Sequence, residues 1–427
     1  MTDPVAGNIA SRPTLAAWLR EYRAIEDEFV AQLAEGGIGF APRDAARTAE
    51  RAARERLRRR GARFMNGEAS ISCGFVSSAC EACVGGQGSK TFFISLACPR
   101  NCYFCFNPNQ EDYAYFLEHD VDWRRAFDEF AASVDEVTHV GLTGGEPLLR
   151  REAMLDFFAY VKERAPQAHA RLYTSGFGLD ERTCADLAER GLDEIRFSVK
   201  VEDGEAAIRE ALDKIDMARG HIADVMVEMP VIPGTQERMR RLLCELDERG
   251  VRGINLLEFC FPLHNWEAFE KRGFKVKNPP FDVLYDYGYA GSLPIAGSEL
   301  ACLELMEYAL DEGLRLGLHY CSLDNKNRDQ LLMANRRAAL DPAVYELAGD
   351  CLYHVAKAFD GDAEPVREYL RGRGAAWVDE DDGALVAFHP RHVDGVKRLG
   401  CACALSYNVI EGEGNALSLR ELKLEMA

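Results

Sequence analysis

The chain has 427 residues, enough for one large domain with an appendage or for two to three domains. With 47% hydrophobic and 28% charged residues, its composition is that of a soluble globular enzyme. A formal net charge of −19 at pH 7 argues against nucleic acid as a partner, because phosphate binding needs clustered positive charge.

The number of cysteines and the first residues of the chain together indicate the cellular compartment in which the protein works. The segment 1–7 lacks the basic region and apolar core of a signal peptide, and no stretch approaches the length of a membrane span. Fourteen cysteines in such a chain favour a reducing cytoplasm, where thiols more often bind metal or take part in catalysis than pair in disulfides. We therefore expect a cytoplasmic, oxygen-sensitive metalloprotein with no membrane partner.

The N-terminal region, residues 1–65, is predicted to consist of helices. Arginines at helical spacing between residues 45 and 63 alternate with glutamates, a pattern typical of a solvated helix face, although a contact for an acidic partner or for nucleic acid also fits. From residue 66 a cysteine-rich, irregular segment is expected to lead into the core, which we place at 66–340.

The core is predicted from a regular alternation of two patterns. Short β-branched or aromatic runs predict strands at 92–96, 138–142, 170–174, 194–199, 224–231 and 254–259. Helical patterns lie between them near 121–134, 151–164, 179–190, 205–219 and 235–249. This alternation predicts an α/β fold with parallel strands and right-handed crossovers.

The remainder of the chain is expected to be less regular. Residues 298–340 look helical around a strand end at 319–321. Residues 341–427 are predicted to form a small α+β appendage, with helical segments at 345–347 and 366–370 and a hairpin over 375–388.

Three cysteines follow the first predicted strand. Cys98, Cys102 and Cys105 are separated by three and then two residues, and this spacing lets one short loop wrap three thiolates around a single iron–sulfur cube. The fourth iron then has no protein ligand and is free to bind a small molecule. A zinc site is the alternative, and three sulfurs at this spacing fit it less well.

A second motif, formed by Gly144, Gly145, Glu146 and Pro147, follows the second predicted strand. The two glycines leave backbone groups open to a ligand because they carry no Cβ. Glu146 supplies a carboxylate for a ligand ammonium group. Taken alone the motif is also an ordinary strand-to-helix turn. Together with the three cysteines it resembles the radical S-adenosylmethionine (radical SAM) superfamily.

The resemblance implies a partial (β/α)6 barrel, a [4Fe–4S] cluster, and S-adenosylmethionine that is cleaved reductively to a 5′-deoxyadenosyl radical. The radical abstracts hydrogen from a small-molecule or peptide substrate, and an electron donor such as flavodoxin or ferredoxin supplies the electron. By motif position, residues 144–147 would grip the methionine amino group. Phe104 would shield the cluster and face the adenine, and Thr174, Ser198 and Lys200 are candidates for the ribose and carboxylate contacts.

Further stretches narrow the resemblance. Cys80 and Cys83 before the first strand, residues 255–259, and Tyr320–Ser322 resemble a radical SAM branch described as related to pyruvate formate-lyase activating enzymes. The likeness covers residues 70–335. It leaves the N-terminal helices and the appendage outside.

The upstream cysteines predict a second metal site. We expect Cys80, Cys83 and Cys321 to hold an auxiliary iron–sulfur cluster, with Cys73 as the leading fourth ligand. A zinc knot, or buried thiols that act as small hydrophobes, are the alternatives.

Three other cysteines are candidate catalytic thiols. Cys260 ends the sixth predicted strand, and Cys401 and Cys403 lie near the end of the chain. Each of these thiols is a candidate to quench a substrate radical. Cys401 and Cys403 could also carry a methyl group or complete the auxiliary cluster. For all three, a purely structural role in packing is the alternative. Glu228, Glu258, His264 and His319 are the candidate proton carriers.

Several functions remain open at this stage. The main hypothesis is a radical SAM enzyme that acts on a small molecule or a peptide. The alternatives are an activase that abstracts hydrogen from a glycyl-radical enzyme, a radical methyltransferase, and a non-catalytic iron–sulfur scaffold or electron carrier. The last of these leaves residues 144–147 unexplained.

Overall fold

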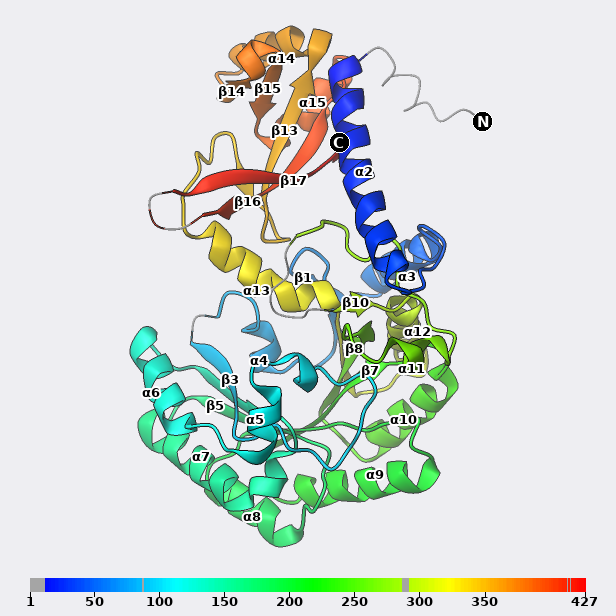
Figure 1. Cartoon of the computed structure of the whole chain (residues 1–427), viewed down its shortest axis with the longest axis vertical. Helices are drawn as coiled ribbons and strands as arrows, with labels where there is room; N and C mark the ends of the chain where they lie inside the picture. The colour runs from blue at the N-terminus through cyan, green and yellow to red at the C-terminus, as the bar shows by residue number, and fades with distance from the viewer. Residues whose placement is uncertain (1–11, 87, 286–291, 413, 415) are drawn as a thin grey trace. The chain divides into compact units, whose positions relative to one another are not determined.

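The computed structural model describes residues 12–86, 88–285, 292–412, 414 and 416–427 (Figure 1). The chain divides into two compact units. We call the first, Ala41–Asn278 and Tyr289–Lys326, the barrel unit. The second, Met1–Phe40, Pro279–Gly288 and Asn327–Ala427, is the tail unit. Within the described residues, no helix is both long and apolar enough to cross a bilayer.

A largely parallel sheet forms the centre of the barrel unit. In the described part of the chain its strand order is β1-β2-β11-β8-β7-β6-β5-β4-β3. The strands are β1 (Arg63–Met65), β2 (Ser70–Cys73), β3 (Ser89–Phe93), β4 (His139–Thr143), β5 (His169–Thr174), β6 (Glu194–Phe197), β7 (Asp224–Val231), β8 (Gly253–Glu258) and β11 (Gly317–Cys321). Pairing is parallel from β3 through β8 to β11, and β2 and β1 then pair antiparallel.

Helices follow the strands and cover one side of the sheet, as Figure 1 shows for α6 to α10. The helices of this unit are α3 (Arg47–Arg59), α4 (Ser78–Glu81), α5 (Tyr113–Glu118), α6 (Trp123–Ser133), α7 (Arg151–Arg164), α8 (Glu181–Glu189), α9 (Glu205–Arg219), α10 (Gln236–Glu248), α11 (Trp266–Glu270) and α12 (Ser298–Asp311). A short pair, β9 (Cys260–Phe261) and β10 (Leu293–Pro294), lies outside the main sheet.

Strand alternation separates an apolar side of the sheet from a polar one. Leu142, Leu172 and Ile195 are fully buried and belong to the main hydrophobic core of the unit. Because successive residues of a strand face opposite sides, their neighbours Arg171 and Arg196 lie on the other side. The concave interior of the barrel unit is therefore lined by polar side chains.

The α/β fold class and the six predicted strands are confirmed, with the first beginning at Ser89 rather than at residue 92. The five helices predicted between them are also present. The prediction of an irregular segment from residue 66 to the first strand is wrong, because Ser70–Cys73 forms β2 and pairs with β11. All four residues of β2 are buried, so the strand has no alternation of polar and apolar residues.

The tail unit is built on an antiparallel sheet of order β14-β15-β13-β16-β17, with β12 on β13. Its elements are α2 (Pro13–Glu35), the end of α13 (Leu323–Asn335), β12 (Glu346–Leu347), β13 (Tyr353–Phe359), α14 (Ala363–Arg371), β14 (Trp377–Glu380), β15 (Leu385–Phe388), α15 (Val393–Arg398), β16 (Ala404–Glu411) and β17 (Ser418–Met426). The helix α2 packs on this sheet, because Leu15 shares a core with Phe359 and the Trp18 ring lies 5.8 Å from the Phe359 ring.

The prediction of an α+β appendage agrees with these elements. The expected hairpin is the β14–β15 pair, and the expected helix at 366–370 lies within α14. The helix expected at 345–347 is wrong, since Glu346 and Leu347 pair with β13 as a strand.

Candidate active site

The three cysteines of the first motif lie on one loop that follows β3. Cys98 is exposed, and Cys102 and Cys105 are half-buried. Burial raises the pKa of Cys98 and of Cys105, the neighbouring thiols add to this rise, and the Lys200 ammonium group opposes it. The Lys200 Nζ also donates a hydrogen bond to Cys102 Sγ. The positive charge of Lys200 therefore acts on all three thiols of the loop, through its field at Cys98 and Cys105 and through a hydrogen bond at Cys102.

The end of β4 holds this loop through the backbone. The Gly145 N–H donates to the Ser95 carbonyl (3.0 Å), and the Glu146 N–H donates to the Ala97 carbonyl (2.8 Å). These two N–H groups are thus already bonded by the cysteine loop. The expectation that the backbone of Gly144 and Gly145 is open to a ligand needs correction for the Gly145 N–H.

The glycines are required because two segments meet at van der Waals distance. A Cβ on Gly145 would lie 1.9 Å from the Ala97 carbonyl oxygen, and one on Gly144 would lie 2.7 Å from Phe93 Cβ. Gly144 also has a φ of +115°, which favours glycine. Its carbonyl accepts a hydrogen bond of 2.7 Å from Asn107 Nδ2. The motif therefore fixes the cysteine loop against the end of β4.

The Glu146 carboxylate, 3% exposed, joins the ends of β4 and β5. Oε1 accepts from Thr174 Oγ1 (2.6 Å) and from the Leu148 N–H (3.3 Å). Oε2 accepts from the N–H (2.8 Å) and Oγ (2.6 Å) of Ser175. An ionised carboxylate has about four acceptor positions, and the chain's own donors use them all. Pro147 follows, is buried, and begins a turn of 3₁₀ helix.

Sequence reasoning missed Ser175. Its position directly after the third strand, beside the predicted Thr174, was the available signal. The reason it escaped is that serine after a strand is common in ordinary turns.

The segment after β6 supports the other side of the loop. Arg100 Nη1 pairs with Asp203 at 2.7 Å, and Tyr103 Oη donates to Glu202 at 3.2 Å. Ser198, predicted to contact a ligand, donates its N–H to the Thr174 carbonyl at 2.9 Å. The ends of β5 and β6 are thereby tied to each other.

Aromatic side chains cover the loop. The ring of Phe104 lies 5.0 Å from that of Tyr103 and 5.6 Å from that of Phe259, and Phe259 stacks on Phe269 at 5.4 Å. His264 Nε2 lies 2.8 Å from the Cys105 carbonyl oxygen, so this histidine serves the loop backbone. The segment that follows β8 therefore packs against the cysteine loop and restricts access of water.

A connected polar network fills the interior of the barrel unit. Arg196 pairs with Glu194 and, at 2.6 Å, with Glu228, which also accepts from Asn255 Nδ2 at 2.6 Å. Burial works against it, but Arg196 and Asn255 lower the pKa of Glu228. Asn255 Oδ1 lies 3.1 Å from His319 Nδ1, and burial lowers the pKa of His319 to about 4. Both predicted proton carriers, Glu228 and His319, are members of this network.

The second set of cysteines borders the same interior. Cys80 lies within α4, and Cys321 is the last residue of β11. Burial raises the pKa of Cys321 to about 12, and the charges of Cys83 and Cys80 add to this rise. Asn255 Nδ2 donates to Cys80 Sγ at 3.3 Å, and Asn325 Nδ2 donates to Cys321 Sγ at 3.3 Å.

Cys73 lies elsewhere. It pairs with Leu318 in the β2–β11 register, whereas Cys321 pairs with Ser70 at the other end of β2. Its side chain belongs to the hydrophobic core, and burial raises its pKa to about 11. The structure therefore does not bring Cys73 to the other three thiols.

The candidate catalytic cysteines are all packed. Cys260 is 4% exposed, and burial raises its pKa to about 11. Cys401 and Cys403 belong to a hydrophobic core of the tail unit together with Val386 and Phe388.

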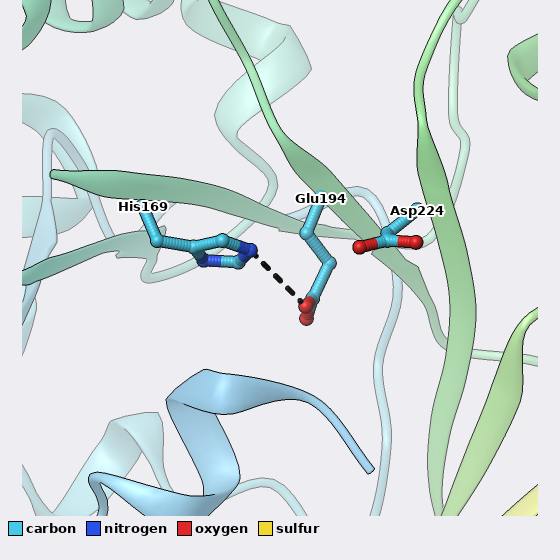
Figure 2. Close-up of side chains that lie close together, drawn as sticks. All are labelled: His169, Glu194 and Asp224. Carbon is cyan, nitrogen blue, oxygen red and sulfur yellow. Dashed lines mark ion pairs between the residues drawn. The ribbon is translucent and has the colours of Figure 1, made fainter. Parts of the chain in front are cut away.

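A third group of metal-ligating side chains lies at the opposite ends of the strands. His169, Glu194 and Asp224 begin β5, β6 and β7, and their ligand atoms all lie within 4.8 Å of one another (Figure 2). Two guanidinium groups already neutralise the acids, because Glu194 pairs with Arg196 and Asp224 pairs with Arg252 at 3.3 Å. This charge balance disfavours a bound cation.

Comparison with known proteins identifies the family. Residues 92–246 match the model of the radical SAM superfamily, and they include the cysteine loop and residues 144–146. Residues 92–246 therefore form a radical SAM domain. This family binds a [4Fe–4S] cluster and S-adenosylmethionine. Three thiols on one loop, with a lysine beside them, are a donor set that fits such a cluster.

Two curated relatives and one solved structure illustrate the similarity. A putative glycyl-radical enzyme activating enzyme of Methanocaldococcus jannaschii is 31% identical over 266 residues, which are 60% of this chain and 65% of the relative. The PqqA peptide cyclase of Methylocella silvestris is 32% identical over 114 residues, 27% of this chain and 29% of the cyclase. Streptococcus suis SuiB bound to its precursor peptide SuiA has a TM-score of 0.40 at 13% identity, over 59% of this chain and 52% of that one.

Proposed function

We propose that the chain is an enzyme that holds a [4Fe–4S] cluster through Cys98, Cys102 and Cys105 and abstracts hydrogen from a peptide or small-molecule substrate. The cluster, when bound, supplies the electron that cleaves S-adenosylmethionine to a 5′-deoxyadenosyl radical. The observation that carries this proposal is the placement of three thiols on one loop at the carboxyl ends of parallel strands, where ligands bind in α/β folds.

The chain's own residues position and protect this loop. Lys200 compensates thiolate charge, which favours the deprotonated sulfur that metal binding requires. Glu146, bonded to Thr174 and Ser175, keeps the ends of β4 and β5 at a fixed separation. Phe259 and its aromatic neighbours exclude water from one side, which would limit quenching of a reactive radical.

The proposal includes a second cluster held by Cys80, Cys83 and Cys321. Its support is that the charges of Cys80 and Cys83 both act on Cys321, and that Asn255 and Asn325 donate hydrogen bonds to two of the sulfurs. Amide donors to cluster sulfurs are a recognised means of tuning iron–sulfur sites. Cys73, packed in the core, is left out of this ligand set.

An activase is the second candidate function. It is favoured by the similarity to a putative glycyl-radical enzyme activating enzyme, which extends over 60% of this chain. In that case the substrate is a backbone glycine of a partner enzyme. The similarity to a PqqA peptide cyclase, which covers 27% of the chain, favours a peptide substrate instead.

The test uses anaerobically reconstituted full-length protein, reduced with dithionite and incubated with S-adenosylmethionine. We expect 5′-deoxyadenosine as the product in wild type and none in the triple Cys98→Ala, Cys102→Ala, Cys105→Ala variant. Cys244→Ala, on the outer helix α10, is the matched control and should retain the product. S-adenosylhomocysteine as the main product would indicate a methyltransferase. The formation of neither product by wild type would contradict the proposal and indicate a non-catalytic iron–sulfur scaffold.

Iron analysis tests the second cluster separately. Replacing Cys80, Cys83 and Cys321 by alanine should remove about four irons per chain, the content of one cube. An unchanged iron content, or zinc in place of the lost iron, would contradict the auxiliary cluster and leave the first cluster unaffected.

A further inference from the structure

The large apolar side chains that are exposed in the barrel unit gather at one end of its sheet. Within the described residues of this unit, those that are 37% to 55% exposed are Tyr115, Leu117, Leu149, Phe177 and Leu263, which we call the apolar rim. All of them lie in segments that follow β3, β4, β5 or β8. Single exposed apolar side chains are ordinary, but a group confined to one edge of a fold marks an interaction surface.

Side-chain contacts connect the segments that carry the rim. Just before α5, Asn109 Nδ2 donates to the Pro262 carbonyl at 2.7 Å, which joins α5 to the segment after β8. Just after α5, Asp120 pairs with Arg150 at 2.8 Å, which joins α5 to the turn after β4. The bonds of Glu146 join that turn to the loop after β5. The rim therefore runs along the same strand ends as the cysteine loop.

The backbone and a ring contact hold rim side chains at the surface. Leu263 has a φ of +62°, a conformation that a bulky side chain adopts only at a cost. Phe177 lies between Gly176 and Gly178, whose φ values are +77° and +71°. The Tyr115 ring stacks on the His119 ring with 4.1 Å between centroids. These side chains are therefore ordered in advance, which lowers the entropic cost of binding a partner.

The rim is acidic around α5. Residues 101–122 contain no lysine or arginine, and their acids are Glu111, Asp112, Glu118, Asp120 and Asp122. Asp120 pairs with Arg150, and Asp122 accepts from the Arg125 N–H at 3.1 Å. The other three are exposed and form no ion pair within the part of the chain that the structure describes. Apolar side chains beside unpaired carboxylates complement a partner segment with apolar and basic side chains.

We infer that the apolar rim and the three unpaired acids beside it dock a peptide substrate through basic and apolar side chains of that peptide. The attribution to the substrate rests on the proposed function, whereas the docking surface itself does not. The same acids would repel an acidic electron-transfer protein, so we assign the surface to the substrate and not to the electron donor. A peptide docked here reaches the strand ends that carry the cysteine loop.

The test measures peptide binding to full-length reconstituted protein by fluorescence anisotropy under anaerobic conditions. The probe is a fluorescein-labelled peptide of lysine and leucine spaced by glycine and serine. Two matched peptides replace its lysines by glutamate or its leucines by serine, and unlabelled competitors remove any effect of the dye. We expect wild type to bind the lysine–leucine peptide at least tenfold more tightly than either matched peptide. Added salt should weaken this binding.

One pair of substitutions tests the apolar part of the surface. Tyr115→Ser combined with Leu117→Ser should lower the affinity for the lysine–leucine peptide at least tenfold. The matched control, Val378→Ser combined with Leu399→Ser, changes two exposed apolar side chains of the tail unit and should leave the affinity unchanged. Iron per chain should equal that of wild type in both, because all four positions are exposed.

A second set of substitutions tests the charges. Glu111→Gln, Asp112→Asn and Glu118→Gln together should lower the affinity for the lysine–leucine peptide at least fivefold and reduce its dependence on salt. The control set makes the same change of net charge at exposed positions of the outer helices α7, α8 and α9, with Glu163→Gln, Glu189→Gln and Glu210→Gln. The control should leave the affinity unchanged, which separates a local surface from attraction by the net charge of the chain.

Several outcomes would overturn the inference. Equal binding of the three peptides by wild type, or equal losses in the rim variants and their controls, would leave no docking surface at the rim. Tighter binding of the glutamate peptide would assign the surface to an acidic partner. A wild-type dimer in sedimentation that Tyr115→Ser with Leu117→Ser converts to a monomer would assign it to a second copy of the chain.

The two proposals fail separately. A protein that binds the lysine–leucine peptide at the rim but forms no 5′-deoxyadenosine refutes the proposed function and leaves the docking surface in place. A protein that forms 5′-deoxyadenosine but does not prefer this peptide refutes this inference alone.

Discussion

Glu258, at the end of β8, is a buried carboxyl whose ionisation should govern the pH dependence of stability. It is 5% exposed, and its Oε2 accepts a hydrogen bond of 2.8 Å from the Leu323 N–H. Burial raises its pKa to about 7, although the Lys277 ammonium group opposes the rise, and Glu299 adds to it. The folded chain therefore keeps a proton on Glu258 at pH values at which the unfolded chain has lost it.

The sign and the size of the effect follow from this difference. Since one pKa unit is worth about 1.4 kcal/mol, a rise from 4.5 to about 7 destabilises the ionised form by on the order of 3 kcal/mol. The stability contributed by the protonated group is complete below pH 4.5 and is lost as the pH rises through about 7. Glu258→Gln, which is neutral at every pH, should avoid this loss.

The assay is urea unfolding of wild type and Glu258→Gln at constant salt, at several pH values from 5 to 8. We expect the variant to gain about 2.5 kcal/mol relative to wild type between pH 5 and pH 8, through the linkage between protonation and stability. Glu270→Gln, which makes the same change at an exposed position, is the control. A difference between wild type and Glu258→Gln that stays constant with pH would refute the reasoning.

Three further substitutions test the packing of the site and of the tail. Gly145→Ala would place a Cβ 1.9 Å from the Ala97 carbonyl oxygen, so we expect a loss of about 1–3 kcal/mol from overpacking and less iron per chain on reconstitution. Arg196→Gln should lower the free energy of unfolding by about 3–5 kcal/mol in urea, because the buried Glu194 and the half-buried Glu228 lose their cation. Phe388→Ala, at a fully buried position of the tail unit, should cost about 3–5 kcal/mol in thermal unfolding.

Each of these has a matched control. Gly361→Ala adds a Cβ that meets no atom within 4 Å, so iron loading should not change. Arg190→Gln and Phe177→Ala make the other two changes at exposed positions. If a control costs as much stability as its buried counterpart, the packing argument for that pair is wrong.

The sequence was sufficient for the order of the strands and helices and for the cysteine loop. Both signals are local: β-branched runs alternate with helical patterns, and the spacing of Cys98, Cys102 and Cys105 lies within one loop. The buried strand Ser70–Cys73 escaped because burial of all its side chains removes alternation. The sequence predicts a helix at Glu346 and Leu347, because two residues carry too little pattern to reveal a partner strand.

Only the tertiary structure determines which groups the polar side chains contact. Local sequence placed Glu146 beside a ligand, but its carboxylate receives the donors of Thr174 and Ser175, which come from the next strand. The buried ion pairs are likewise invisible in sequence, because Arg196 pairs with Glu194 of its own strand and with Glu228 of the next strand. Electrostatic pairing acts through space between distant residues, whereas hydrophobic periodicity and cysteine spacing are properties of contiguous chain.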